Sequence, residues 1–312
     1  MNKNFEKIQS LLQEKADYLS RKKFIEYDGS VEIKTVNNEK YLYIRKRDAG
    51  RNTSKYVDKY SDELYQLLLK QTKEMKLIKK EVRRIEKELA LLGYVENDLS
   101  PRIILNIEFA RVNIKNLIYD QAVLEGVATT FTQTETIIEN GKVNGVTASD
   151  VQKILNLKHA WEFILDNEVI LSPSNYYLLS YVAKIINEGF YENGGRIRCV
   201  PVSIGGSNYI PSIPIENVVK ENIDEIVNSD MSPIDTAIEL CLYCMKTQIF
   251  NDGNKRASII FANQYLISKG EGLLVVPEAK VSEFKKLLVE YYEEKNIDKI
   301  KMFLKEKCWR KF

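Results

Sequence analysis

The residues best suited to chemistry form one short segment, Gln248 to Arg256, which reads QIFNDGNKR. It opens a predicted helix whose apolar residues continue to Gly270. The first N–H groups of a helix lack backbone partners and the helix dipole is positive there, so this position suits a phosphate. Asp252 beside it could hold a divalent metal that shares the phosphate oxygens. The alternative is a capped surface helix with solvated charges.

Other groups with chemical potential give weaker patterns. Cys241 and Cys244 have the spacing of half a zinc or redox site, but no second Cys/His pair is near, so core packing on one helix face is favoured. His159 is the only histidine and lies in an apolar helical stretch, which favours a structural role. The sequence has neither a GxxxxGK[ST] loop nor a GxGxxG turn, so P-loop and Rossmann sites lack their signatures.

Composition is that of an ordinary globular protein, with 312 residues, 44% hydrophobic and 29% charged. No apolar run reaches the roughly 20 residues that span a bilayer, and the N-terminus lacks the apolar core of a signal peptide. Four cysteines indicate no disulfide framework, which favours a reducing cytoplasm. Residues 1–92 hold 22 Lys+Arg and 15 Asp+Glu (+7), whereas residues 93–312 hold 24 and 29 (−5), which predicts two modules.

The basic N-terminal third predicts a helix over 3–23 and a β-hairpin with alternating residues over 31–43. The second arm continues into a run of Arg, Lys and Tyr that ends at Tyr60. Basic and aromatic residues on a ribbon, here 30–60, could follow a nucleic-acid backbone. The alternative is an edge hairpin whose lysines prevent edge-to-edge pairing.

Residues 61–92 predict one long helix that begins at Ser61-Asp62-Glu63 and ends at Gly93. Its apolar residues alternate three and four apart, which is a heptad seam. The seam could form a homo-oligomer, but packing on the helix at 3–23 is the favoured interpretation.

The remainder is predicted to be mainly helical, with helices over 100–125, 148–166, 174–188, 233–247, 280–294 and 296–307. Between them, residues 196–210 predict a short hairpin that turns at Gly205-Gly206.

The segment from Gln248 to Arg256 resembles the signature of the Fic/Doc (Fido) family, His-x-Phe-x-Asp/Glu-Gly-Asn-Gly/Lys-Arg, at eight of nine positions. The resemblance extends over about 98–305 and implies a helical fold with a small hairpin that transfers AMP from ATP to a protein hydroxyl. It implies that Phe250 anchors the loop and that Asp252 holds Mg²⁺. It also assigns the nucleotide phosphates to a cradle of four residues: Gly253, Asn254, Lys255 and Arg256.

The departure from the family is at the catalytic base, where Gln248 replaces the His. An amide cannot accept a proton at neutral pH, so the chain as written should be nearly inactive. Either the protein is naturally degenerate or a His was replaced to silence a toxic activity. Lys255 is similar to the residue of the Doc toxin, which transfers the terminal phosphate, so phosphoryl transfer is the alternative.

Two further segments carry the resemblance. Leu124-Glu125-Gly126 is similar to the end of the family's inhibitory motif, whose Ser/Thr position is Gln121 here. The family's second motif Arg, which pairs with that Glu, is Ile259, so Lys255 or Arg256 would have to replace it. The turn of the predicted hairpin is similar to the family's target-docking flap: Gly205, Gly206, Ser207, Asn208 and Tyr209.

The sequence thus predicts a mainly α protein: an N-terminal region of helix, β-hairpin and long helix (1–97), then a helical Fic-like domain with a small flap (98–312). The predicted function is that of a cytoplasmic protein adenylyltransferase, impaired by Gln248. Its expected partners are ATP, Mg²⁺ and a hydroxyl-bearing protein, with no membrane. The alternatives are a Doc-like phosphotransferase toxin of a toxin–antitoxin pair, or a non-catalytic module that binds a nucleotide or partner.

Overall fold

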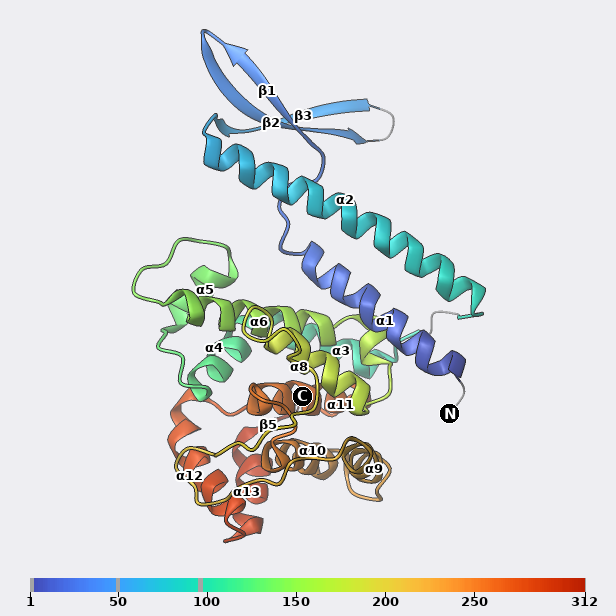
Figure 1. The fold of residues 1–312 in the computed structure, drawn as a ribbon, viewed down its shortest axis with the longest axis vertical. Helices are drawn as coiled ribbons and strands as arrows, with labels where there is room; N and C mark the ends of the chain where they lie inside the picture. The colour runs from blue at the N-terminus through green and yellow to red at the C-terminus, as the bar shows by residue number, and fades with distance from the viewer. Residues whose placement is uncertain (1–2, 49–50, 95–97, 312) are drawn as a thin grey trace. The chain divides into compact units, whose positions relative to one another are not determined.

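The computed structural model describes residues 3–48, 51–94 and 98–311, and the chain forms two compact units, 1–96 and 97–312 (Figure 1). The first unit holds α1 (Lys3–Lys22), β1 (Ser30–Val36), β2 (Glu39–Asp48), β3 (Arg51–Lys59) and α2 (Asp62–Leu91). The second unit is mainly helical, which confirms the predicted fold class.

The first unit is an antiparallel sheet in the order β1-β2-β3 with α2 against one face. Leu42 and Ile44 of β2 are buried with Leu68 of α2. The predicted two-stranded hairpin was incomplete, because β3 adds a third strand. The sequence did not predict β3 because the strand is mostly charged and polar. Among its described residues, Val57 alone packs on the core cluster of Leu42, Ile44 and Leu68.

The long helix α2 agrees with its prediction, and the side chain of Ser61 accepts the N-cap hydrogen bond from the N–H of Leu64. Part of the heptad seam packs within the unit, where Ile85 and Leu89 are buried against Leu11 and Leu12 of α1. This intramolecular packing confirms the favoured interpretation of the seam.

The second unit begins with six helices. They are α3 (Pro101–Val112), α4 (Ile114–Leu124), α5 (Phe131–Ile138), α6 (Ala148–Ile164), α7 (Asn167–Ile170) and α8 (Tyr176–Ile186). The single helix predicted over 100–125 was wrong, because the helix breaks at Asn113, whose side-chain amide donates to the carbonyl of Phe109. The short helices α5 and α7 were not predicted.

The unit ends with five more helices and a small sheet. They are α9 (Glu216–Val227), α10 (Pro233–Thr247), α11 (Asn254–Lys269), β4 (Leu273–Leu274), the 3₁₀ turn Glu278–Lys280, α12 (Val281–Tyr292), α13 (Ile297–Phe303), the π-helical turn Leu304–Cys308 and β5 (Trp309–Arg310). Helix α9 was not predicted, and the helix predicted over 296–307 continues from α13 into the π-helical turn.

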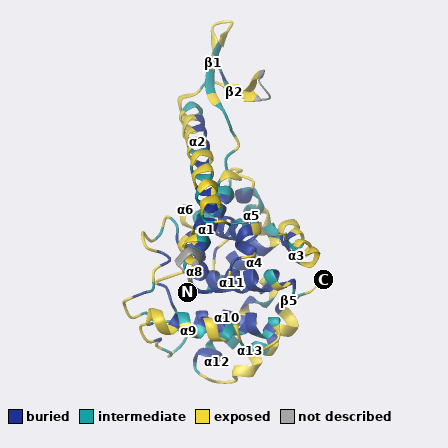
Figure 2. Cartoon of the chain, turned by 90° about the vertical axis from the view of Figure 1, so that its right-hand side faces the viewer, coloured by how far each residue is buried: buried dark blue, intermediate teal, exposed yellow. Residues whose placement is uncertain are grey.

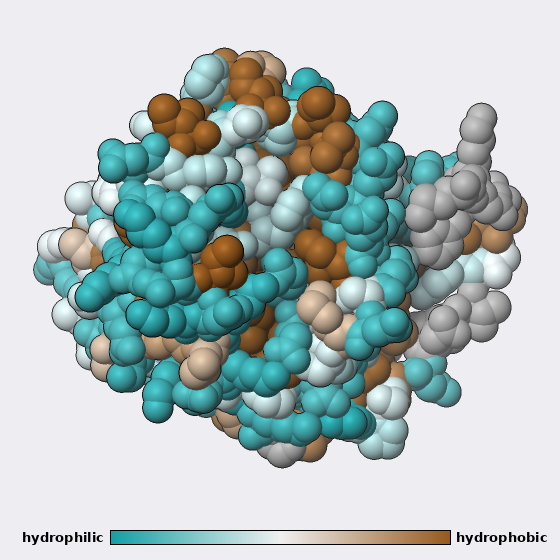
Figure 3. Space-filling model, turned by 90° about the horizontal axis from the view of Figure 1, so that it is seen from below, coloured by the Kyte–Doolittle hydropathy of each residue, from teal (hydrophilic) through white to brown (hydrophobic). Residues whose placement is uncertain are grey.

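Helix α11 is the centre of the second unit, and Figure 2 shows it among buried neighbours. It is buried from Arg256 to Ile267 and contacts α3, α6, α7, α8, α10 and β4. A helix surrounded in this way holds its N-terminal residues in fixed positions. On the face seen in Figure 3, apolar side chains reach the surface in separate patches among hydrophilic ones.

The predicted hairpin over 196–210 is wrong as a strand pair. Residues 201–210 keep the turn at Gly205-Gly206, but no strand forms within this segment. Its hydrogen bonds go elsewhere: Glu293 accepts from the N–H of Asn208 and from the hydroxyl of Ser207.

Candidate active site

The loop between α10 and α11 has a residue in the left-handed conformation at each end. Gln248 ends α10 at φ 50° and ψ 60°, and Gly253 precedes α11 at φ 74°. A Cβ on Gly253 would lie 2.7 Å from Cγ2 of Ile186 and 3.0 Å from Oδ1 of Asn187, so the position requires glycine for its contacts as well as its φ.

Asn254 closes this loop with its side chain. Its Oδ1 accepts from the N–H of Phe250 at 2.9 Å, and its Nδ2 donates to the carbonyl of Phe250 at 2.7 Å. Phe250 is buried, so the loop is anchored in the core. Because the Asn254 amide is used inside the loop, its contribution to an anion site would come from its backbone N–H at the start of α11.

Gln248 is bound on both sides of its amide. Nε2 donates to the carbonyl of Met245 at 2.6 Å, and Oε1 accepts from Nδ2 of Asn254 at 3.2 Å. The side chain therefore helps to shape the loop, and it presents no group that could act as a base.

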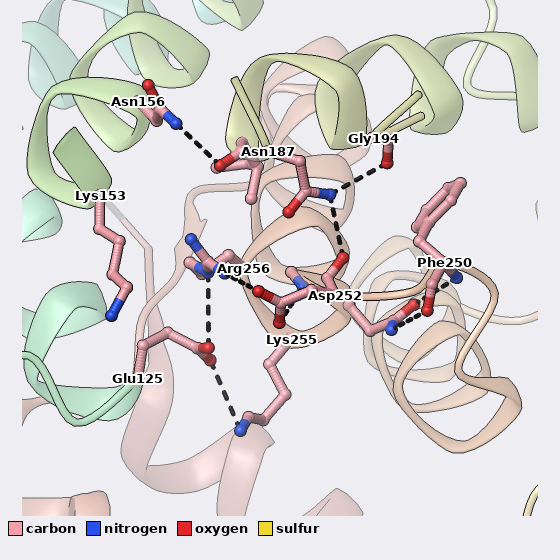
Figure 4. A network of polar contacts seen from close by, with 12 residues as sticks. Glu125, Lys153, Asn156, Asn187, Gly194, Phe250, Asp252, Lys255 and Arg256 are labelled. Atoms are coloured by element: carbon pink, nitrogen blue, oxygen red, sulfur yellow. Dashed lines mark hydrogen bonds and ion pairs between the residues drawn. The ribbon is translucent and has the colours of Figure 1, made fainter. Parts of the chain in front are cut away.

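Arg256 is the central cation of the site (Figure 4). It is buried, with a side chain only 4% exposed, yet its Nε and Nη1 have no hydrogen-bond partner. Its Nη2 lies 3.3 Å from Oδ2 of Asp252, whose side chain is half exposed, and its Nε lies 3.5 Å from Oε2 of Glu125. Buried polar groups are normally satisfied, so these two nitrogens indicate a place for an acceptor.

Glu125 faces the two cations predicted as alternatives for its partner. Besides the contact with Arg256, its Oε1 lies 3.7 Å from Nζ of Lys255 and has no hydrogen bond. Ile259, at the family's second Arg position, is buried and apolar. Figure 4 shows Glu125 pointing toward both cations across the start of α11.

Gln121 holds α4 in place beside this cation pair. Its Nε2 donates to the carbonyl of Arg256 at 2.9 Å, and its Oε1 accepts from Nε1 of Trp161 at 3.1 Å. Glu125 follows four residues later on the same helix face. The burial of Tyr292, reinforced by the Glu125 carboxylate, raises the pKa of the Tyr292 hydroxyl.

Two residues of this site were not predicted. Asn187 donates from Nδ2 to the carbonyls of Asp252 and Gly194, both at 3.0 Å. Arg198 donates from Nε to the carbonyl of Gln248 at 2.5 Å and from its backbone N–H to the carbonyl of Ile249. Both are fully buried polar residues in loops or helix ends, and the sequence marks neither position.

The flap residues lie on a segment that is joined to the site at its base. Arg198 also donates to the carbonyls of Val200, Pro211 and Ser212, at both ends of the flap. Tyr209 stacks on Tyr292 with ring centroids 6.2 Å apart. At the turn, a Cβ added to Gly205 or Gly206 would meet nothing within 4 Å, so this end of the flap is open.

The other residues singled out in the sequence lie in the core. Cys241 and Cys244 are buried in α10, which confirms their packing role, and burial raises the pKa of both thiols. His159 is buried in α6, with Nδ1 3.6 Å from Oε2 of Glu188. In the described part of the chain, no group of three or more His, Cys, Asp and Glu side chains could hold a metal. No helix there is long and apolar enough for a membrane crossing.

Comparison with known proteins agrees with this geometry. Residues 174–266 match the Fic/DOC family, and residues 5–66 match a domain of unknown function, DUF6788. No curated protein matches the chain.

Solved structures share the fold at low identity. A Fic-1 fragment from C. elegans has a TM-score of 0.52 and 18% identity, over 78% of this chain and 73% of that one. A Fic-domain-containing signaling protein from Bacteroides thetaiotaomicron has a TM-score of 0.51 and 17% identity, over 62% and 75%. A Fic family protein from Desulfovibrio desulfuricans has a TM-score of 0.51 and 16% identity, over 68% and 73%. The motif, its geometry and the family match agree, so residues 174–266 are similar to the Fic/DOC family and the solved structures share the fold.

Proposed function

We propose that the second unit is a Fic-type protein adenylyltransferase that transfers AMP from ATP to a Ser, Thr or Tyr hydroxyl of a target protein. The observation that carries this proposal is the buried Arg256 guanidinium, with two unpartnered nitrogens at the start of α11, inside the segment that matches the family. A buried cation with free donors at a helix N-terminus suits a phosphate chain.

The residues around Arg256 would divide the work of binding Mg-ATP. Arg256 and Lys255 would bind phosphate oxygens, and the N–H groups at the start of α11 would add to the positive field. The half-exposed carboxylate of Asp252 fits Mg²⁺, which commonly uses one or two carboxylates together with substrate phosphates. The ion would neutralise phosphate charge while this chain holds the phosphates in position.

Gln248 limits this chemistry. The target hydroxyl must lose a proton as it attacks phosphorus, and an amide that is already hydrogen-bonded to Met245 and Asn254 cannot take it. Loss of a general base typically costs about 10²–10⁴-fold in rate. The chain as written would therefore bind nucleotide and transfer AMP very slowly.

The flap supplies a surface for the target. Between Val200 and Ile215 four apolar side chains are exposed by about half or more: Val200, Ile210, Ile213 and Ile215. This segment forms no strand and is not paired within a sheet. A target segment could pair with that backbone and place its own apolar side chains against these four.

Glu125 would oppose nucleotide binding. Its carboxylate lies against Arg256 and Lys255, where a terminal phosphate would compete for the same cations. Two anions cannot share these cations without repulsion. We infer that Glu125 inhibits the site by occupying the place of that phosphate.

Lys255 gives the second candidate function, a Doc-like phosphotransferase. This cation is partly exposed and 3.7 Å from Glu125, so it could hold a phosphate of a nucleotide bound in the opposite direction. The terminal phosphate would then face the target hydroxyl. The four cysteines are free, which would suit an adenylyltransferase or a phosphotransferase that acts in the reducing cytoplasm.

The test restores the base. Gln248→His protein is incubated with a lysate and ATP labelled at the α- or γ-phosphate, beside the unaltered chain and a Gln248→His/Arg256→Met control. We expect α-label on proteins only with Gln248→His alone, at least about a hundredfold above the unaltered chain. Transfer of the γ-label alone would establish the phosphotransferase instead. No gain in either label would overturn both and leave a non-catalytic nucleotide-binding module.

A further inference from the structure

The first unit carries an exposed basic ribbon, defined here as residues 45–47 of β2 and 52–55 of β3. Every one of these residues is exposed, although β2 is buried only a few residues earlier, at Leu42 and Ile44. The two strands run side by side to one end of the sheet in Figure 1. The ribbon is thus the part of the sheet that α2 leaves uncovered.

The strand register sorts the ribbon into two faces. Arg45 lies opposite Ser54 and Arg47 opposite Asn52, so these four share one face. Lys46 and Lys55 lie on the other face. The first face therefore combines two guanidinium groups with an amide.

The two guanidinium groups of this face form no ion pair with a described side chain, although Glu32 on the same face attracts Arg45. Among the described side chains, Arg45, Arg47 and Lys55 form no ion pair. Other cations of the sheet do: Lys59 lies 2.5 Å from Glu39, Lys34 lies 3.6 Å from Glu32, and Lys46 lies 3.3 Å from Asp28. Free guanidinium groups side by side repel one another, and an anionic partner would relieve this repulsion.

Protection of a sheet edge does not explain Arg45. The sheet order is β1-β2-β3, so β2 is the central strand. Arg45 pairs with Ser30 of β1 on one side and with Ser54 of β3 on the other. Charges that block edge-to-edge pairing belong on edge strands, and Arg45 is not on one.

Aromatic contacts brace the ribbon at its base. The rings of Tyr43 and Tyr56 meet edge to face with centroids 5.6 Å apart, and Tyr41 lies 6.2 Å from Tyr56. Nζ of Lys34 lies 4.4 Å from the centre of the Tyr43 ring. These cross-strand contacts hold the register, and so the alignment of Arg45 and Arg47.

We propose that the basic ribbon binds double-stranded DNA in its major groove. That groove is about 12 Å wide and admits a two-stranded β-ribbon. Arginine and asparagine make the commonest paired hydrogen bonds to guanine and adenine edges there, and Lys55 on the opposite face can reach a phosphate. The deep, narrow major groove of duplex RNA would exclude the ribbon.

A second basic surface of the same unit serves as the control. Six cations of α2 surround a hollow of about 550 Å³: Lys76, Lys79, Lys80, Arg83, Arg84 and Lys87. Lys76 and Lys80 are exposed and form no ion pair with described residues. Removing these two charges changes the net charge by as much as removing Arg45 and Arg47, but it leaves the ribbon intact.

The experiment measures binding of the full chain to a fluorescent 30-base-pair DNA duplex by anisotropy across a salt series. The unaltered chain is compared with Arg45→Gln/Arg47→Gln and with Lys76→Gln/Lys80→Gln, each checked by circular dichroism for a native melting curve. We expect the ribbon variant to bind about tenfold or more weakly. The α2 variant should change the affinity by less than about threefold.

Three results would overturn the proposal. One is no binding of duplex DNA by the unaltered chain at low salt. Another is an equal loss in the two variants, because the attraction would then depend on net charge alone. The third is tighter binding of the corresponding single strand, of duplex RNA or of polyglutamate than of duplex DNA, because each would point to a different occupant of the ribbon.

Discussion

Two arginines of the second unit, Arg198 and Arg256, are almost equally buried but differ in how completely their side chains are hydrogen-bonded. Arg198 is 1% exposed and donates to the carbonyls of Gln248, Val200, Pro211 and Ser212. Arg256 is 3% exposed and keeps two nitrogens without a hydrogen bond. Burial lowers the pKa of the Arg198 guanidinium, and its fixed carbonyl dipoles offset part of that cost.

The difference indicates what each cation is for. Arg198 joins the two ends of the flap to the backbone at Gln248 and Ile249, so its bonds are complete without any ligand. Arg256 donates from Nη2 to Asp252 at 3.3 Å, but its Nε lies 3.5 Å from Glu125 without a hydrogen bond, which leaves it able to take a phosphate in place of Glu125. A satisfied buried arginine stabilises the fold, whereas an incompletely satisfied one favours a ligand.

The largest effect on stability should come from removing the hydrogen bonds of Arg198. Arg198→Met would remove the donor from the carbonyls of Gln248, Val200, Pro211 and Ser212, and we expect a loss of about 3 kcal/mol in the free energy of unfolding. Arg256→Met removes two unsatisfied nitrogens together with the cation, so its cost should stay within about 1 kcal/mol. Urea unfolding followed by tryptophan fluorescence measures both.

ATP provides the converse measurement on the same pair. Mg-ATP should raise the unfolding midpoint of the unaltered chain and of Arg198→Met but not that of Arg256→Met. Equal destabilisation by the two substitutions, together with an ATP response in Arg256→Met, would abolish the distinction between them.

Substitutions at two glycines beside the site cations should have effects of intermediate size on stability. Gly253 and Gly126 both adopt positive φ, 74° and 76°, but only Gly253 has neighbours where a Cβ would lie. Gly126→Ala should cost about 1 kcal/mol for the backbone alone. Gly253→Ala adds the overlap with Ile186 and Asn187, so we expect about 1–3 kcal/mol more.

The same unfolding assay checks this pair. If the two alanine variants were equally stable, the loop before Arg256 would have room to adjust, and the rigid presentation of this guanidinium would be disproved.

The sequence predicted the elements whose signals are local. The cap at Ser61 and the end at Gly93 defined α2, and Ser232-Pro233 defined the start of α10. The motif from Gln248 to Arg256 located the candidate site. The break at Asn113 was missed because both helices it separates carry similar apolar patterns.

The remaining parts of the site depend on contacts between distant segments. Arg198 lies 50 residues before Gln248, and nothing in its neighbours reveals that its partners will be carbonyls. The hairpin predicted for the flap failed for a related reason. Its polar groups are satisfied by Glu293, 85 residues beyond Asn208, and not by a facing strand. Such pairings follow from the assembled fold, which a single sequence does not display.

The smallest effect separates Glu125 from the rest of the carboxylates around the site. Glu125→Gln keeps the shape of the side chain and removes its charge, so a phosphate would no longer compete with an anion at Arg256 and Lys255. We expect ATP to bind about tenfold more tightly, which is about 1.4 kcal/mol, as measured by calorimetry. Glu135→Gln is the matched control, because Glu135 pairs with Lys115 at 2.8 Å and not with the site cations. An unchanged affinity in Glu125→Gln would mean that Glu125 supports Arg256 without opposing the nucleotide. In that case phosphate binding at Arg256 would depend on its two unpartnered nitrogens and not on the charge of Glu125.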